Sequence, residues 1–333
     1  MSEPVLRVQD LAVHFTSQSG GILRRKERVL KAVDGISFDL YPGETLGIVG
    51  ESGSGKSTLA RAILGLVRPQ RGRVLWMGED LTRLETEELR LKRKELQIVF
   101  QDPIASLNPR MTAGAIIAEP LWTFYPQMER LQVEERTRGM LKMVGLLPNQ
   151  INRYPHEFSG GQCQRIGIAR SLVLNPKLLI CDEPVSALDV SIQAQIINLL
   201  RDLQKKLGLA LIFIAHDLSI VRHISDRVMV MYLGRSMEVA DKASLYRRPL
   251  HPYSRALMKS IPIPDPRLAH EIKQDLWLTG DMPSPFNPPR GCVFHTRCPY
   301  LVKRCQAEVP ALRRMESGDW VACHRAEELD LSI

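Results

Sequence analysis

The feature that most constrains the fold is a glycine-rich loop at residues 50–58, which reads GESGSGKST. The five residues before it, TLGIV, are apolar and partly β-branched, and the residues after it, 59–66, favour a helix. Such a loop between a strand and a helix is typical of phosphate binding, because its glycines let amide groups and the helix N-terminus face one phosphate. We therefore predict an α/β fold built around a nucleotide site.

Each residue of this loop has a predicted task. Lys56 reaches the β and γ phosphates, and Ser57 offers its hydroxyl to Mg²⁺. The amide groups of the loop hold the phosphates, and the residues predicted to take part are Gly50, Ser52, Gly53, Ser54, Gly55 and Thr58. ATP and Mg²⁺ are the predicted ligands.

A second apolar run, LLICD at residues 178–182, ends in a carboxylate and is followed at once by Glu183. Four apolar residues suit a buried parallel strand whose carboxyl end faces the ligand, as in open α/β sheets. We predict that Asp182 holds Mg²⁺, directly or through water, and that Glu183 polarises the attacking water. A strand followed by a charged turn is the alternative.

Two further strand ends carry polar side chains that suit the same site. Residues 209–215 are apolar and precede His216, whose ring can hydrogen-bond the γ-phosphate or the attacking water. Gln101 follows the apolar run 97–100, and an amide there can touch Mg²⁺ or its water and still release it easily. A structural histidine and an ordinary loop glutamine are the alternatives.

The tract FSGGQ at residues 158–162 opens a predicted helix shortly before the acidic strand. Its amide groups form a second phosphate-seeking set, which requires a nucleotide held by a partner. Together with the SALD loop at residues 186–189, these motifs resemble, in order, those of the ATPase subunits of ATP-binding-cassette transporters. The resemblance implies a head-to-tail dimer that closes over two nucleotides.

This resemblance also implies the architecture and the remaining site residues. The expected fold is a P-loop NTPase with a RecA-like parallel sheet, an N-terminal antiparallel β subdomain and a helical subdomain inserted at about residues 102–165. Phe15 would stack on adenine, although a core phenylalanine is the alternative. The residues expected to act across the dimer, or beside its nucleotide, are Ser159, Gly160, Gly161, Gln162 and Asp189.

Residues 102–110, 152–157 and 251–257 are similar to those of oligopeptide and dipeptide importers. This implies a peripheral ATP-hydrolysing subunit at the cytoplasmic face of the inner membrane. Its expected partners are a homologous second ATPase subunit, two transmembrane permease subunits and an extracytoplasmic peptide-binding protein. The helix-forming segment 128–146 would grip a short helix of a permease. A cargo such as nickel or a glycan stays an alternative.

A soluble ATPase acting on nucleic acid or ribosomes is a rival of another class, but the chain has one phosphate loop and no sustained heptads. Its net charge of +8 could indicate nucleic acid. However, the basic cluster at residues 24–28 lies in a polar insertion without interleaved aromatic residues. We expect a solvated loop there, or contact with anionic lipid, and no nucleic acid. We also expect no secretory signal and no membrane span.

We predict a nucleotide-binding domain at residues 1–250 and a C-terminal extension at residues 251–333. The extension holds four of the six cysteines: Cys292, Cys298, Cys305 and Cys323. In a reducing compartment, clustered thiols favour a metal site over disulfides. The spacing lacks paired CxxC sequences, which weakens zinc, and four thiolates are the usual complement of a [4Fe-4S] cluster. The resemblance implies this cluster, with zinc, free thiols and a redox-sensing regulator as alternatives.

Overall fold

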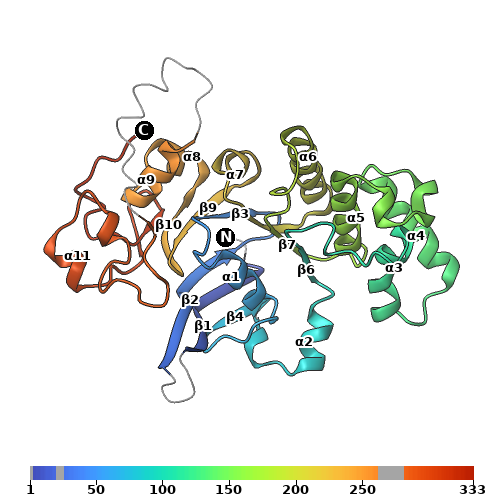
Figure 1. Ribbon diagram of the computed structural model, residues 1–333, viewed down its shortest axis with the longest axis horizontal. Helices are drawn as coiled ribbons and strands as arrows, with labels where there is room; N and C mark the ends of the chain where they lie inside the picture. Colours follow the sequence, from blue (N-terminus) through green and yellow to red (C-terminus); the bar gives the residue numbers. More distant parts are fainter. Residues whose placement is uncertain (1–2, 20–25, 262–280) are drawn as a thin grey trace. The chain divides into compact units, whose positions relative to one another are not determined.

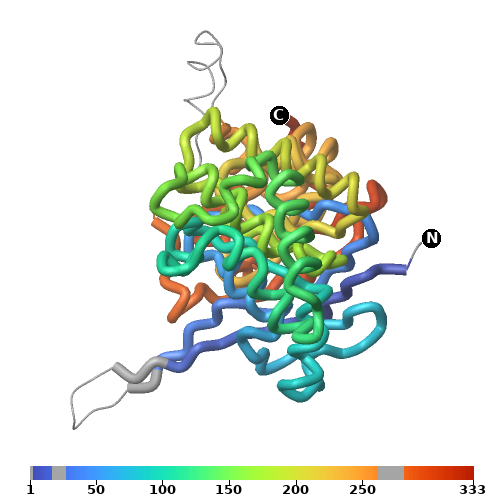
Figure 2. The backbone as a smooth tube through the Cα atoms, turned by 90° about the vertical axis from the view of Figure 1, so that its right-hand side faces the viewer, coloured from blue at the N-terminus to red at the C-terminus, as the bar shows by residue number. Residues whose placement is uncertain are grey.

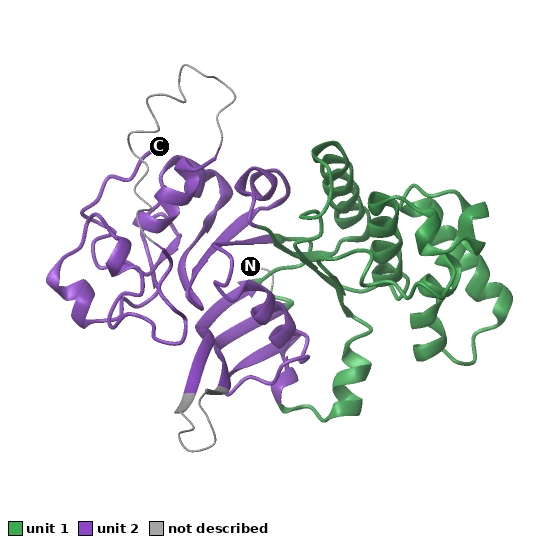
Figure 3. Ribbon diagram, in the orientation of Figure 1, with its two compact units in different colours: residues 1–5, 40–45, 83–215 green, residues 6–39, 46–82, 216–333 purple. Residues whose placement is uncertain are grey.

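The computed structural model describes residues 3–19, 26–261 and 281–333. Two compact units make up this part of the chain (Figure 3). Unit 1 comprises residues 1–5, 40–45 and 83–215, and unit 2 comprises residues 6–39, 46–82 and 216–333. Arg24 and Arg25 of the basic cluster lie outside the described residues. The predicted domain boundary at residue 250 stays a prediction.

Unit 2 contains a four-stranded sheet in the order β2-β1-β4-β5. β1 (Leu6–Ser19) and β2 (Lys26–Leu40) run side by side (Figure 2), followed by β4 (Arg71–Trp76) and β5 (Glu79–Asp80). β4 is antiparallel to both β1 and β5, as predicted for the N-terminal subdomain. β1 extends to Ser19, four residues beyond Phe15.

A second sheet region of unit 2 carries the phosphate loop. β3 (Thr45–Val49) is parallel to β9 (Arg227–Tyr232), which pairs antiparallel with β10 (Arg235–Asp241). β12 (Trp320–Val321) joins β10, and β11 (Arg313–Arg314) joins β12, so the C-terminal extension adds strands to this sheet. The helices and 3₁₀ turns among the described residues here are α1 (Lys56–Ile63), η1 (Leu81–Arg83), α7 (Leu218–Ile224), α8 (Lys242–Arg247), α9 (Pro252–Lys259), η5 (His295–Arg297) and α11 (Lys303–Ala307) (Figure 1).

Unit 1 contains three parallel strands, β6 (Leu96–Val99), β7 (Leu178–Asp182) and β8 (Ala210–Ile214). Every residue of β7 and β8 is buried, which explains why these segments are continuous apolar runs rather than alternating ones. α6 (Val190–Leu207) buries an apolar stripe and ends at Gly208, whose φ of 64° suits a left-handed cap. The predicted strands before Gln101, Glu183 and His216 are therefore present.

The remaining elements of unit 1 are mainly helical. They are α2 (Thr86–Lys92), α3 (Ala113–Phe124), α4 (Arg130–Met143), η2 (Pro148–Asn152), η3 (Pro155–Glu157) and α5 (Gly160–Leu172). α3, α4 and α5 pack on one another, and α4 lies within the helix-forming segment 128–146. The predicted α/β class with an inserted helical part is confirmed. No described helix combines the length and the apolar character needed to cross a membrane.

Candidate nucleotide site

The phosphate loop adopts a conformation that only glycine permits at two of its positions. Gly50 and Gly55 have φ angles of 152° and 101°. A Cβ atom on Gly50 would lie 2.1 Å from the carbonyl oxygen of Met231, and one on Gly55 would lie 2.0 Å from that of Ala32. These glycines therefore let the loop bend while it touches the neighbouring backbone.

Lys56 begins α1 and turns back over the loop. Its buried side chain donates hydrogen bonds to the carbonyl oxygens of Gly50 at 2.8 Å and Glu51 at 3.0 Å, and to Ser54 Oγ at 3.4 Å. Ser52 and Gly53 beside it are exposed. A cation held by neutral acceptors next to exposed amides suits a phosphate, which would form stronger, charge-assisted bonds with the ammonium group.

Two other predicted site residues belong to unit 2. Phe15 on β1 is 41% exposed, so it is not a core side chain, and stacking on adenine stays a prediction. His216 is exposed and stands before α7, whose N-terminus is capped by Asp217 through bonds from the amides of Ser219 at 2.8 Å and Ile220 at 3.4 Å. This cap fixes the backbone that follows His216.

Two predicted catalytic residues meet within unit 1. Gln101 Nε2 donates a 2.9 Å hydrogen bond to Glu183 Oε2, although the residues are 82 positions apart. Gln101 follows β6 and Glu183 follows β7, and these strands are parallel neighbours, so their carboxyl ends lie together. Asp182 closes β7 and is 3% exposed. The pairing places an amide donor on the carboxylate predicted to polarise water.

The backbone at Glu183 is strained. Its φ of 48° lies in the left-handed region, which costs a residue other than glycine on the order of 1–3 kcal/mol. Two hydrogen bonds hold this conformation: Glu183 N donates to Ile214 O at 3.0 Å, and Ser186 Oγ donates to Glu183 O at 3.1 Å. Strain that surrounding contacts maintain at one carboxylate is typical of a functional position.

The signature tract also belongs to unit 1, where it forms the start of α5. Ser159 caps the helix: its Oγ accepts from Gln162 N at 3.4 Å, and Gln162 Oε1 accepts from Ser159 N at 3.0 Å. Gly161 lies against α6, because a Cβ atom there would be 2.5 Å from Ile192 Cγ2. Asp189 is the N-cap residue of α6 and is exposed. The signature and the SALD loop are thus held through adjoining helices.

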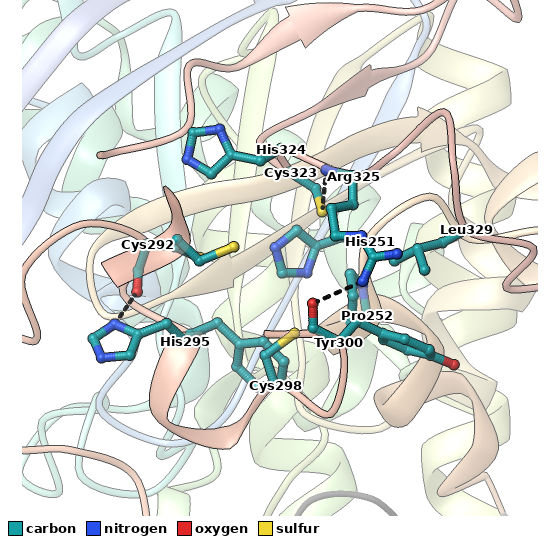
Figure 4. A pocket seen from close by; sticks show the side chains of 12 residues that line it. His251, Pro252, Cys292, His295, Cys298, Tyr300, Cys323, His324, Arg325 and Leu329 are labelled. Atoms are coloured by element: carbon teal, nitrogen blue, oxygen red, sulfur yellow. Dashed lines mark hydrogen bonds between the residues drawn. The ribbon is translucent and has the colours of Figure 1, made fainter. Parts of the chain in front are cut away.

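The prediction of a [4Fe-4S] cluster in the C-terminal extension is wrong. The four cysteines do line one small pocket, the cysteine pocket, together with His251, Pro252, Phe294, His295, Tyr300, His324, Arg325 and Leu329 (Figure 4). However, among the described residues no three or more His, Cys, Asp or Glu side chains are placed to hold a metal ion. This finding does not support the zinc alternative either, and all six cysteines are free thiols.

The cysteine pocket is small, and burial favours the neutral form of several of its thiols. Its volume of about 20 Å³ matches one small solvent molecule rather than a four-iron cluster. Burial raises the pKa of Cys298 to about 12 and that of Cys323 to about 11, and it also raises the pKa of Cys292. Metals bind the thiolate, whereas these environments favour the thiol. Sequence spacing showed where the cysteines gather but not how their sulfur atoms are placed.

The C-terminal extension contacts the phosphate loop, and no sequence motif predicts this contact. Tyr253 and Arg297 both bind Glu51, across 202 and 246 positions of the chain. Neither residue forms part of a local nucleotide motif, so no spacing rule could have identified this contact. The hydrogen bonds to Glu51 in the folded chain reveal it.

Two family models match the chain. Residues 33–186 match the model described as ABC transporter, and residues 237–305 match the model described as oligopeptide/dipeptide transporter, C-terminal region. The first match contains the phosphate loop, Gln101, the signature tract and Glu183. The second covers α9 and three of the four cysteines of the pocket.

Individual proteins agree with these models. The chain is 59% identical over 309 residues, 92% of each chain, to the oligopeptide transport ATP-binding protein OppF of Salmonella typhimurium. It is 53% identical over 326 residues, 97% of each chain, to AppF of Bacillus subtilis, which bears the same description. Among solved structures, the dimeric post-hydrolysis cassette MJ0796 bound to ADP and Pi has a TM-score of 0.63 at 28% identity, over 71% of this chain and 98% of that chain. The structure of cbiO1 from Clostridium perfringens, described as part of the ABC transporter complex cbiONQ, has a TM-score of 0.65 at 26% identity, over 82% of this chain and 100% of that chain.

Proposed function

Because the chain belongs to the ABC transporter family and carries the C-terminal region of its oligopeptide and dipeptide transporters, we propose that it is the ATP-hydrolysing subunit that drives oligopeptide uptake. The observation that carries this proposal is the hydrogen bond between Gln101 and Glu183, found in a chain so similar to peptide-transport ATPases. ATP is the substrate, and Mg²⁺ bound with it neutralises charge on the phosphates.

The phosphate loop is the proposed cradle for ATP. The amides of residues 52–58 bind the β and γ phosphates, and Lys56 exchanges its contacts with Gly50 and Glu51 for phosphate oxygens. Ser57 supplies a hydroxyl on the metal side, and Asp182 supplies a carboxylate. Phe15, exposed on β1, offers its ring to adenine.

Glu183 is the proposed group that polarises the attacking water. Gln101 donates a hydrogen bond to the Glu183 carboxylate and so holds this carboxylate in one orientation. When ATP is bound, Gln101 would also contact Mg²⁺ or its water and so sense the nucleotide. His216 contacts the γ-phosphate or the water. Little covalent chemistry is required of the protein, so positioning and charge compensation supply most of the catalysis.

The exposed N-terminus of α5 is proposed to act on a second nucleotide. Ser159 and the following glycines present amide groups that suit a phosphate. The phosphate loop of the same chain has its own amide groups and does not need these. A homologous second ATPase subunit would receive them over its ATP, and Asp189 would lie at the same dimer surface. The dimeric structure of the MJ0796 cassette supports an ATPase pair of this kind.

A hollow in the helical part of unit 1 is the proposed seat of a permease helix. The cavity has a volume of about 320 Å³ and lies among α3, α4 and η2, with Gly114, Ala118, Trp122, Val133 and Ile151 in its lining. Trp122 is 49% exposed at its wall. An apolar aromatic side chain beside an open hollow is suited to a partner helix. We place the assembled subunit at the cytoplasmic face of the inner membrane, beneath two permease subunits that receive peptide from a binding protein.

Peptide uptake tests the proposed function. Cells that lack this chain, but keep the other subunits, should regain uptake of a labelled oligopeptide when the wild-type chain is expressed. Glu183→Gln should bind ATP normally but lower turnover by at least about a hundredfold, because it removes the group that polarises water. Restored uptake of nickel or a glycan, with no restored peptide uptake, would replace the proposed cargo.

A further inference from the structure

Glu51, the second residue of the phosphate loop, is held by the C-terminal extension. Its backbone N–H donates to Tyr253 Oη at 3.0 Å. Its carboxylate accepts two hydrogen bonds from Arg297 Nη1, at 2.8 Å and 3.1 Å. The extension therefore binds both the backbone and the side chain of one loop residue.

These contacts come from ordered, buried groups. Tyr253 is fully buried and the Arg297 side chain is 7% exposed, whereas exposed ion pairs elsewhere in the extension leave both side chains in solvent. The Tyr253 ring meets the rings of Tyr232 and Phe294, with centroids 4.7 Å and 5.3 Å away. Burial raises the pKa of Tyr253, so its hydroxyl stays neutral. Ring packing of this kind leaves the hydroxyl few alternative positions.

Arg297 is anchored to the nucleotide-binding core as well as to the loop. Its Nη1 also donates to Tyr232 Oη at 3.4 Å, and its guanidinium lies over the Tyr232 ring, 5.9 Å from the centroid. Tyr232 ends β9, two residues before Gly234, whose N–H donates to Ser54 O at 2.9 Å. The β9–β10 turn and the extension thus hold different parts of the same loop.

Glu51 transmits this restraint to Lys56. The carbonyl oxygen of Glu51 accepts a 3.0 Å hydrogen bond from Lys56 Nζ, the group that meets phosphate in the proposed function. One residue is therefore fixed at its N–H, its carboxylate and its carbonyl group. Any rotation of the Glu51 backbone would displace the acceptor that orients Lys56 before the nucleotide arrives.

We propose that Tyr253 and Arg297 are positioning residues of the ATP site, through which the C-terminal extension sets the affinity of the phosphate loop for Mg·ATP. The inference rests on the proposed role of residues 50–58 as the ATP-binding loop. Neither residue needs to touch the nucleotide, since they act through Glu51. A preorganised loop binds more tightly because less ordering has to occur on binding.

Binding by the full-length chain tests this inference. A fluorescent methylanthraniloyl derivative of ATP, with Mg²⁺, gives Kd for each variant. Arg297→Gln should raise Kd roughly tenfold, within the usual range of coupling between distant sites, and Tyr253→Phe roughly threefold, as expected for the loss of one neutral hydrogen bond. Arg297→Lys, which keeps the charge, should restore part of the affinity. Tyr253→Phe keeps the buried ring, so a folded variant remains available if Arg297→Gln proves unstable.

Three comparisons separate positioning from general damage. Arg313→Gln breaks an exposed pair with Glu327 in the same extension and should leave Kd at the wild-type value. Glu51→Gln combined with Arg297→Gln should weaken binding by less than the product of the single effects, because both act on one contact. For hydrolysis, Arg297→Gln should raise KM while changing kcat less than about twofold, as expected for lost ground-state binding.

The outcomes distinguish this inference from the proposed function. Wild-type Kd and KM in both Arg297→Gln and Tyr253→Phe, with Lys56→Ala still defective in binding, would overturn the positioning role and leave the ATP site standing. Wild-type binding in Lys56→Ala would instead remove residues 50–58 from ATP binding. Equal weakening by Arg313→Gln would show that the extension acts only through overall stability and would also overturn the inference.

Discussion

The phosphate loop and the cysteine pocket belong to the same compact unit, but the loop stabilises a charged side chain and the pocket favours neutral thiols. The loop keeps an ammonium group, that of Lys56, buried among carbonyl and hydroxyl acceptors and beside the exposed residues Ser52 and Gly53. The cysteine pocket favours the neutral form of its thiols at two positions: burial raises the pKa of Cys298 to about 12 and that of Cys323 to about 11. The first region is arranged to accept an anion, and the second is arranged to avoid forming one.

This difference shows what turns a group of reactive side chains into a binding site. Neutral acceptors around Lys56 can be exchanged for phosphate oxygens without leaving a buried charge unpaired. The thiols would first have to lose protons in a place that disfavours thiolates. Gathering the right residue types is therefore not sufficient, and the environment must also stabilise the charge state that binding needs.

The largest expected effect is on the affinity for Mg·ATP, and it comes from removing the ammonium group of Lys56. Lys56→Ala should weaken Mg·ATP binding by at least about a hundredfold, since each hydrogen bond to a charged group contributes about 1.5–3 kcal/mol and two are lost. Hydrolysis should fall further. The measurement is Kd by titration with the fluorescent ATP derivative, with Arg313→Gln as the matched control that removes a cation elsewhere. Unchanged binding would contradict the claim that Lys56 makes the phosphate loop a binding site for an anion.

The second effect concerns the thiols. At pH 8, Cys298 and Cys323 should react with iodoacetamide roughly a hundredfold more slowly in the folded chain than in the denatured chain, because the thiolate is the nucleophile. Mass spectrometry of the alkylated peptides gives the rate at each site. Equal rates in the folded and denatured chain would show that the pocket does not suppress thiolate formation.

A smaller effect is expected on the pH dependence of stability, and it comes from the buried carboxylate of Glu238. Glu238 on β10 accepts hydrogen bonds from the amides of Leu250 at 2.8 Å and His251 at 2.9 Å. Burial nevertheless raises its pKa to about 7, and the nearby Asp319 raises it too, while the Ser254 hydroxyl and these amides oppose the shift. The folded chain therefore holds a proton that the unfolded chain releases near pH 4.5.

Since the folded state binds more protons in this range, the stability that Glu238 contributes should fall as pH rises from about 4.5 to 7. Between pH 5 and pH 8, the stability advantage of the wild type over Glu238→Gln should shrink by about 2 kcal/mol. The opposing titration of His251, whose pKa burial lowers to about 3, is common to both chains. Urea unfolding at the two pH values measures the difference, and the exposed Glu316→Gln is the control. A difference independent of pH would contradict the raised pKa.

Consecutive residues were the predictable part of this molecule. Strand, loop and helix around residues 50–58 follow from local rules, because Gly50 and Gly55 determine the backbone and Lys56 begins the helix. The strands before Gln101 and Glu183 could also be predicted, because both are apolar runs. Their parallel pairing brings the two side chains together. The capping of α5 by Ser159 follows from the same local chemistry.

What could not be predicted depends on distant segments. The orientation of four thiols drawn from residues 292–323 depends on how several short turns pack, and spacing carries no information on it. The contact of Arg297 with Glu51 joins residues 246 positions apart. The strained φ of Glu183 likewise depends on a bond to the end of β8. In each case tertiary packing, rather than local propensity, decides the result.

The rate of ATP hydrolysis by the assembled transporter tests the central claim most directly. The complex of this chain with its second ATPase and permease subunits should hydrolyse ATP faster when peptide-loaded binding protein is added than with the unloaded protein. Glu183→Gln in the same complex should abolish that stimulation while leaving ATP bound. A rate indifferent to peptide-loaded binding protein, or full stimulation in Glu183→Gln, would contradict the account.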